Sequence, residues 1–167
     1  VALNLGAAYI MAGENPILGD FRLGSGSMGL MIGLGNSNSM ANVLTKPNNE
    51  IRPAYIEGEL AIHQSGLRAL LASPRTKEAQ LNYTIEAALS VVRSLRTMGR
   101  PAIFDLGNTL TTNVNRLQRE MDQIVLVVEP NPVALAMARE SLQDLEPGSG
   151  SSGRVHVVVV NRAQSNT

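Results

Sequence analysis

Apolar residues recur at helical spacing in several stretches of the chain. The clearest stretch covers residues 83–98, where the apolar side chains at 85, 88, 89, 92 and 95 form one face of a helix. Asn82 or Thr84 can cap the start of this helix, and Gly99 can end it. Further helices are predicted over residues 3–11, 112–120 and 130–145.

Short apolar runs separate these helices and predict strands. The runs at 123–128 and 155–160 are almost unbroken, which is typical of strands covered on both faces. Because strands alternate with helices, the pattern favours an α/β fold with a mostly parallel sheet and right-handed crossovers. Strands are predicted at residues 17–21, 60–62, 67–72, 102–106, 123–128 and 155–160.

Composition limits the classes of function. The chain has 167 residues, the size of one domain, and fourteen Lys and Arg balance fourteen Asp and Glu, so nothing favours non-specific binding to nucleic acid or to an anionic membrane. The absence of cysteine excludes disulfides, zinc–thiolate sites and cysteine nucleophiles. No apolar run approaches the roughly 18 residues of a membrane span. The chain also starts without the pattern of a signal peptide, so we expect a cytoplasmic protein.

Two of the four aspartates follow predicted strands. Asp20 and Asp105 each stand at or near the carboxyl end of a strand, and in a parallel α/β sheet that edge carries the ligand. A carboxylate there can hold hydrated Mg²⁺ beside a nucleotide phosphate. Alternatively, each aspartate merely caps the next helix.

An amide and a guanidinium follow the last predicted strand. Asn161, with Arg162 beside it, can bind an adenine edge through its paired donor and acceptor, or it can be an ordinary turn residue. The two histidines are isolated in the sequence, and the alternating position of His156 predicts a structural role. No Ser-His-Asp or His-x-x-His spacing is visible.

A glycine-rich stretch offers a different hypothesis. Gly24, Gly26 and Gly29 match G-x-G-x-x-G after a predicted strand, as in a Rossmann-type oxidoreductase. A dinucleotide site requires a helix to follow, but Gly33 and Gly35 limit any such helix to about one turn. A plain loop is the other interpretation of these glycines.

In their order along the chain, these pieces resemble the MinD/ParA family of deviant-Walker ATPases, most closely its CpaE-like (TadZ-like) pilus-assembly branch. Residues 1–8 resemble the helix after that family's phosphate loop, and residues 17–22 resemble the strand that carries its Asp-x-Asp pair. Residues 103–107 are similar to the Walker B strand, and residues 158–163 to the strand with the adenine-contacting Asn. The likeness spans essentially the whole chain and also includes residues 65–74 and 125–130.

The resemblance implies a doubly wound, mostly parallel α/β sheet of the P-loop NTPase type. It implies ATP and Mg²⁺ as cofactors, with Asp105 and Asp20 at the metal, Asp20 also in a catalytic role, and Asn161 and Arg162 at the nucleotide. In that family ATP promotes a homodimer that binds partners. We therefore expect secretion, pilus or cell-pole positioning proteins as partners, no specific nucleic acid, and at most peripheral contact with a membrane.

The departures from the family pattern matter as much. The 167 residues contain no G-x-x-x-x-G-K-[ST], and neither Lys46 nor Lys77 lies in a glycine-rich loop. We therefore expect residues 1–167 to be one nucleotide-binding-type domain trimmed at both ends.

Arg22 stands where the resemblance places the family's second aspartate, which helps to activate the attacking water. A cation cannot act as that base, so hydrolysis should be weak or absent, and the alternative is a degenerate scaffold that does not hydrolyse ATP. Arg22 can instead form a structural ion pair with Asp20.

Overall fold

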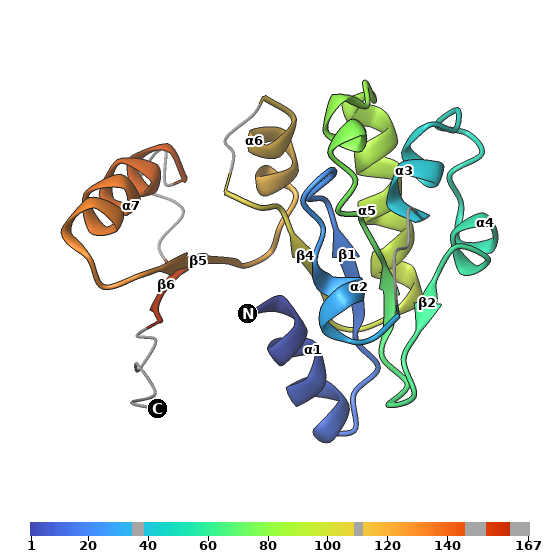
Figure 1. Cartoon of the computed structure of the whole chain (residues 1–167), viewed down its shortest axis with the longest axis horizontal. Helices are drawn as coiled ribbons and strands as arrows, with labels where there is room; N and C mark the ends of the chain where they lie inside the picture. The colour runs from blue at the N-terminus through green and yellow to red at the C-terminus, as the bar shows by residue number, and fades with distance from the viewer. Residues whose placement is uncertain (35–38, 109–111, 146–152, 161–167) are drawn as a thin grey trace. The chain divides into compact units, whose positions relative to one another are not determined.

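The computed structural model describes residues 1–34, 39–108, 112–145 and 153–160. The chain divides into two compact units, Val1–Val114 and Asn115–Thr167, which are described separately (Figure 1). The prediction of one domain over residues 1–167 stays a prediction. Among the described residues, no helix is long and apolar enough to cross a membrane.

The first unit is built on a four-stranded sheet of β1 (Ile17–Asp20), β2 (Ala61–Ile62), β3 (Arg68–Leu70) and β4 (Ala102–Asp105), in the order β2-β3-β1-β4. β1 pairs in parallel with both β3 and β4, whereas β2 pairs antiparallel with β3. All four strands fall where the apolar runs predicted them.

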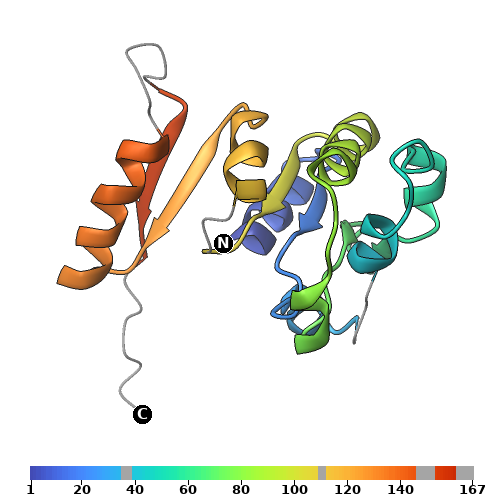
Figure 2. The ribbon, with the colours of Figure 1, turned by 90° about the horizontal axis from the view of Figure 1, so that it is seen from above.

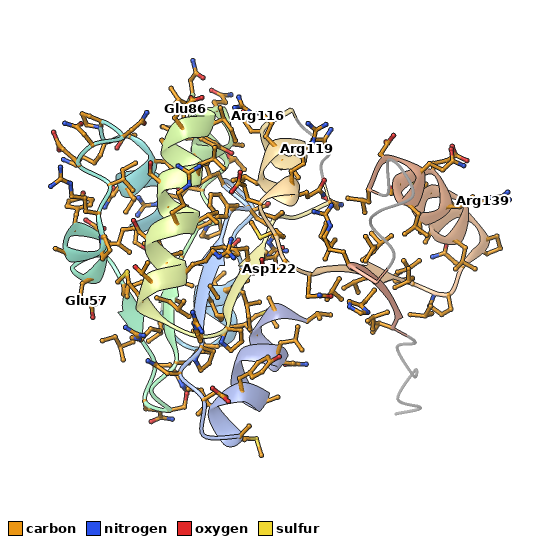
Figure 3. The ribbon with its side chains drawn as sticks, turned by 180° about the vertical axis from the view of Figure 1, so that it is seen from behind. Glu57, Glu86, Arg116, Arg119, Asp122 and Arg139 are labelled. Carbon is orange, nitrogen blue, oxygen red and sulfur yellow. The ribbon has the colours of Figure 1, made fainter. Side chains whose placement is uncertain are left out.

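Helices cover both faces of this sheet. On one face Leu18 packs with Leu67 and with side chains of α1 (Ala2–Met11). On the other face lies α5 (Ile85–Met98), which stands in front of the strands in Figure 3. A β-carbon added to Gly19 would lie only 3.2 Å from the Leu95 side chain of α5, so the glycine allows this close approach. The sheet is therefore covered on both sides, as the doubly wound prediction requires.

Local sequence signals explain where the long helix begins. The side chain of Thr84 accepts a hydrogen bond from the backbone amide of Ala87 at 3.1 Å, so Thr84 is the residue that caps α5.

Shorter helices connect the other elements: α2 (Met28–Met31), α3 (Ser39–Leu44), α4 (Pro53–Glu57) and the 3-10 helix η1 (Thr76–Gln80).

The second unit holds a parallel pair of strands, β5 (Ile124–Val128) and β6 (Val155–Val159), with α7 (Pro132–Leu145) between them in sequence. α6 (Thr112–Arg119) crosses the boundary between the units. Figure 2 shows α7 running along one side of the strand pair. Val125 and Val127 remain 41% and 44% exposed. Within this unit α7 packs against one face of the strand pair (Figure 2), and coverage of both faces stays a prediction.

Candidate functional site

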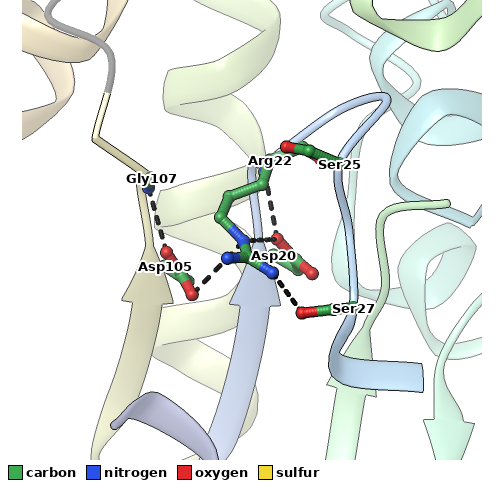
Figure 4. A network of polar contacts seen from close by, with 6 residues as sticks. All are labelled: Asp20, Arg22, Ser25, Ser27, Asp105 and Gly107. Carbon is green, nitrogen blue, oxygen red and sulfur yellow. Dashed lines mark hydrogen bonds and ion pairs between the residues drawn. The ribbon is translucent and has the colours of Figure 1, made fainter. Parts of the chain in front are cut away.

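Two aspartates meet at the carboxyl ends of neighbouring strands. Asp20 is the last residue of β1 and Asp105 the last of β4, and the two are directly paired in the parallel register. The amide of Phe21 then donates to the carbonyl of Asp105 at 2.9 Å, which extends the pairing past both side chains. The structure thus brings together the two carboxylates that the sequence singled out (Figure 4).

The guanidinium of Arg22 lies between the two carboxylates. Its Nε is 3.6 Å from Asp20 Oδ1 and 3.5 Å from Asp105 Oδ2. Its Nη2 donates a hydrogen bond to Ser27 Oγ, and its backbone amide donates to Asp20 Oδ1 at 3.0 Å. Nε makes no hydrogen bond that satisfies normal geometry with either carboxylate, so the two acceptors share one cation.

Asp20 is fully buried, with 0% of its surface exposed. Desolvation raises the pKa of this carboxyl above its ordinary value, and the Asp105 charge adds to the rise. The backbone amide and the charge of Arg22 act in the opposite direction but do not cancel it. Its Oδ2 is buried without a hydrogen-bond partner, so Asp20 retains an acceptor that no described protein group satisfies.

Asp105 is less buried than Asp20, since 28% of its side chain is exposed. Its Oδ1 accepts a hydrogen bond from the amide of Gly107 at 2.9 Å. Gly107 has φ +74°, and a β-carbon there would lie 3.2 Å from Cγ of Arg22. A glycine at this position therefore fixes the Asp105 turn and leaves room for the Arg22 stem.

The glycine-rich loop after β1 packs against the end of β3. A β-carbon on Gly26 would lie 2.2 Å from the carbonyl oxygen of Ala72, and one on Gly24 would lie 2.7 Å from Ala79. The helix that follows, α2, has only four residues. Close packing therefore explains these glycines, and the loop does not lead into the helix that a dinucleotide site requires.

The remaining candidates do not join this cluster. Asn161 and Arg162 lie outside the described residues. His63 contacts Ser65 in the β2–β3 turn, and His156 contacts Gln123 Oε1 at 2.6 Å in the second unit. The described residues contain no group of three or more His, Cys, Asp or Glu placed to hold a metal ion.

Sequence reasoning missed two members of the site. Ser27 fixes Arg22, and Gly107 fixes Asp105. Gly107 follows a strand-end aspartate by two residues, a spacing that indicates a side-chain turn. No spacing in the sequence indicated the contact of Ser27, because it depends on how the glycine-rich loop folds back.

Comparison with solved structures shows which known proteins have a similar fold. No family model matches the sequence, and no curated protein matches it significantly. Among solved structures, a ParA family ATPase from Chlorobium tepidum TLS superposes with a TM-score of 0.77 at 14% identity over 99% of this chain. The MinC:MinD cell division protein complex of Aquifex aeolicus gives a TM-score of 0.66 at 17% identity over 95% of it.

A third solved structure with a similar fold is named as a synthase rather than as an ATPase or a cell division protein. Cobyrinic acid a,c-diamide synthase from Mycobacterium smegmatis, with bound ADP and magnesium, gives a TM-score of 0.64 at 15% identity over 96% of this chain. The chain spans 69%, 61% and 66% of the three neighbours' own lengths. At identities this low the likeness shows the fold alone, and that fold is the ParA/MinD-type P-loop ATPase fold.

Proposed function

We propose that this chain is the core of an ATP-dependent positioning or assembly protein of the MinD/ParA type, acting in pilus or secretion assembly as in the CpaE-like branch. The observation that supports this most is the pairing of Asp20 with Asp105 at the carboxyl ends of β1 and β4. That edge is where α/β sheets with parallel strands bind their ligands. One structural neighbour is named as an ATPase and another holds ADP and magnesium, which agrees with the proposal.

The two carboxylates would fit a nucleotide-bound magnesium ion once the Arg22 guanidinium moves out from between them. Mg²⁺ is commonly held by one or two carboxylates together with phosphate oxygens and water. Asp105 is partly exposed toward this edge, and the buried Asp20 has an unsatisfied oxygen. In this proposal Asp105 supports the metal, Asp20 assists it, Asn161 binds the adenine, and Arg162 lies beside it at the nucleotide. Bound Mg²⁺ would neutralise phosphate charge.

In this proposal, nucleotide binding drives the protein to form a homodimer. The MinC:MinD neighbour is a complex with a protein partner, which supports the proposal that this chain also binds one. Hydrolysis is proposed to be weak or absent, because Arg22 occupies the place of a base and pairs with both carboxylates. The same contacts favour a second candidate, a scaffold that keeps the fold and its partner surface but no longer turns over ATP.

The test uses the full-length natural protein. We expect a fluorescent ATP analogue to bind in the presence of Mg²⁺, and sedimentation velocity to show a dimer with ATP that is absent with ADP. Asp105→Asn should weaken binding at least tenfold, whereas Asp144→Asn, an exposed aspartate on α7, should leave it unchanged. A properly folded protein that binds no nucleotide would support the scaffold, and equal loss in both variants would remove Asp105 from the site.

A further inference from the structure

We propose that Arg22 is an internal cation that competes with a divalent metal ion for Asp20 and Asp105. The inference rests on the proposed function, because it concerns the regulation of the same carboxylate pair. With Arg22 in place the pair is closed to metal, and metal enters only when the guanidinium leaves.

Geometry makes the two cations mutually exclusive. The Nε of Arg22 lies 3.5–3.6 Å from an oxygen of each carboxylate. Mg²⁺ requires its oxygen ligands at about 2.0–2.1 Å in a nearly octahedral shell. A metal bound to both aspartates would lie against the guanidinium, and the two positive charges would repel each other in a poorly solvated place.

The surroundings hold Arg22 in this position. Ser27 accepts a hydrogen bond from Nη2, and the positive-φ turn at Gly107 lies against the arginine stem. The backbone amide of Arg22 is itself bound to Asp20. The side chain therefore starts from an ordered state, which increases the advantage of the internal cation over one from solution.

Two features allow the exchange. The Arg22 side chain is 27% exposed although its Nε is buried, so part of the side chain borders solvent and leaves a way outward for the guanidinium. The fully buried Asp20 keeps Oδ2 without a partner, so a metal ion would gain a ligand that Arg22 leaves unused. The site is thus a carboxylate pair with an incomplete internal counter-ion.

The test measures binding of Mn²⁺ alone to the 167-residue chain, by the electron paramagnetic resonance signal of free Mn²⁺. We expect millimolar or weaker binding by the wild type and at least tenfold tighter binding by Arg22→Gln. Arg93→Gln, an exposed arginine on α5, is the matched control and should behave as the wild type. Adding Asp105→Asn to Arg22→Gln should abolish the gain.

A milder variant covers the case in which Arg22→Gln does not fold. Ser27→Ala keeps every charge and removes one hydrogen bond from Nη2, so it should tighten Mn²⁺ binding by about two- to tenfold. Equal Mn²⁺ affinity in the wild type and a folded Arg22 or Ser27 variant would overturn the inference.

The outcomes for the two proposals are distinguishable. If Arg22→Gln gains Mn²⁺ affinity but the full-length protein binds no ATP analogue, the competition stands and the proposed function fails. If the full-length protein binds ATP with Mg²⁺ while Mn²⁺ affinity does not depend on Arg22, the proposed function stands and the competition fails.

Discussion

Arg22 contacts Asp105 across two neighbouring strands, with Nε 3.5 Å from Oδ2, although the two residues are far apart in sequence. The contact exists because β1 and β4 end at the same level of the sheet. It joins the strand-end turn after β1 to the one after β4. A single side chain therefore contacts the carboxylates at the ends of both strands.

The first prediction concerns stability. Arg22→Ala removes the shared cation and leaves the buried Asp20 carboxylate without a charged partner. We expect a loss of about 3 kcal/mol in the free energy of unfolding, the low end for breaking a buried pair because Arg22 is partly exposed. Urea denaturation of this variant and of the exposed control Arg93→Ala checks it, and equal stability of the two would show that the ion pairs contribute nothing.

The second prediction concerns pH. Burial raises the pKa of Asp20 above 3.8, so the folded state binds this proton more tightly than the unfolded state. The stability that Asp20 contributes is therefore fully present below its unfolded pKa and is lost as the pH rises through its folded pKa. Relative to Asp20→Asn, the wild type should lose unfolding free energy from acid toward neutral pH. Urea denaturation of both proteins across that range measures the difference, and a relative gain by the wild type would contradict the sign.

The third prediction separates packing from ligand binding in the glycine-rich loop. Gly26→Ala would place a methyl group 2.2 Å from the Ala72 carbonyl oxygen, and we expect a loss of about 1–3 kcal/mol. Gly58→Ala is the control, because its β-carbon would find an ordinary contact at 3.6 Å. Thermal denaturation of both variants tests this. If Gly26→Ala melts like the control, close packing does not explain the glycine.

The fourth prediction returns to hydrolysis in the full-length protein. Arg22→Asp would replace the cation with a carboxylate that can orient water, and we expect phosphate release to rise about a hundredfold. Without Mg²⁺ the same variant should melt at a lower temperature, because three carboxylates would then lie together. Unchanged turnover with a lowered melting temperature would show that Arg22 is only structural.

Much of the site could be predicted from the local pattern of apolar and polar residues and from one rule about parallel sheets. Apolar runs placed the strands, and the rule that parallel strands end at one edge of the sheet predicted that Asp20 and Asp105 lie at the same edge. An ion pair between Arg22 and Asp20 could also be foreseen from their separation of two residues. The contact of Arg22 with Asp105 could not, because it requires the order of β1 and β4, which no local signal encodes.

Other features could not be predicted from the residue pattern, because they depend on how distant parts of the chain pack together. Unbroken apolar runs predicted strands buried on both faces, but such a run does not show which element covers each face; within the second unit, α7 covers one face of β5 and β6 (Figure 2). The role of Ser27 depends on the path of the loop that carries it. The roles of Asn161 and Arg162 stay predictions.

The most direct measurement of the central claim is hydrogen–deuterium exchange of the full-length protein with and without ATP and Mg²⁺. The account predicts slower exchange of backbone amides in residues 20–27 and 105–108, the two turns that carry Asp20, Arg22 and Asp105, with no change in the β2–β3 turn around His63. Nucleotide-dependent protection elsewhere, with exchange in both turns unchanged, would contradict a nucleotide site at the ends of β1 and β4.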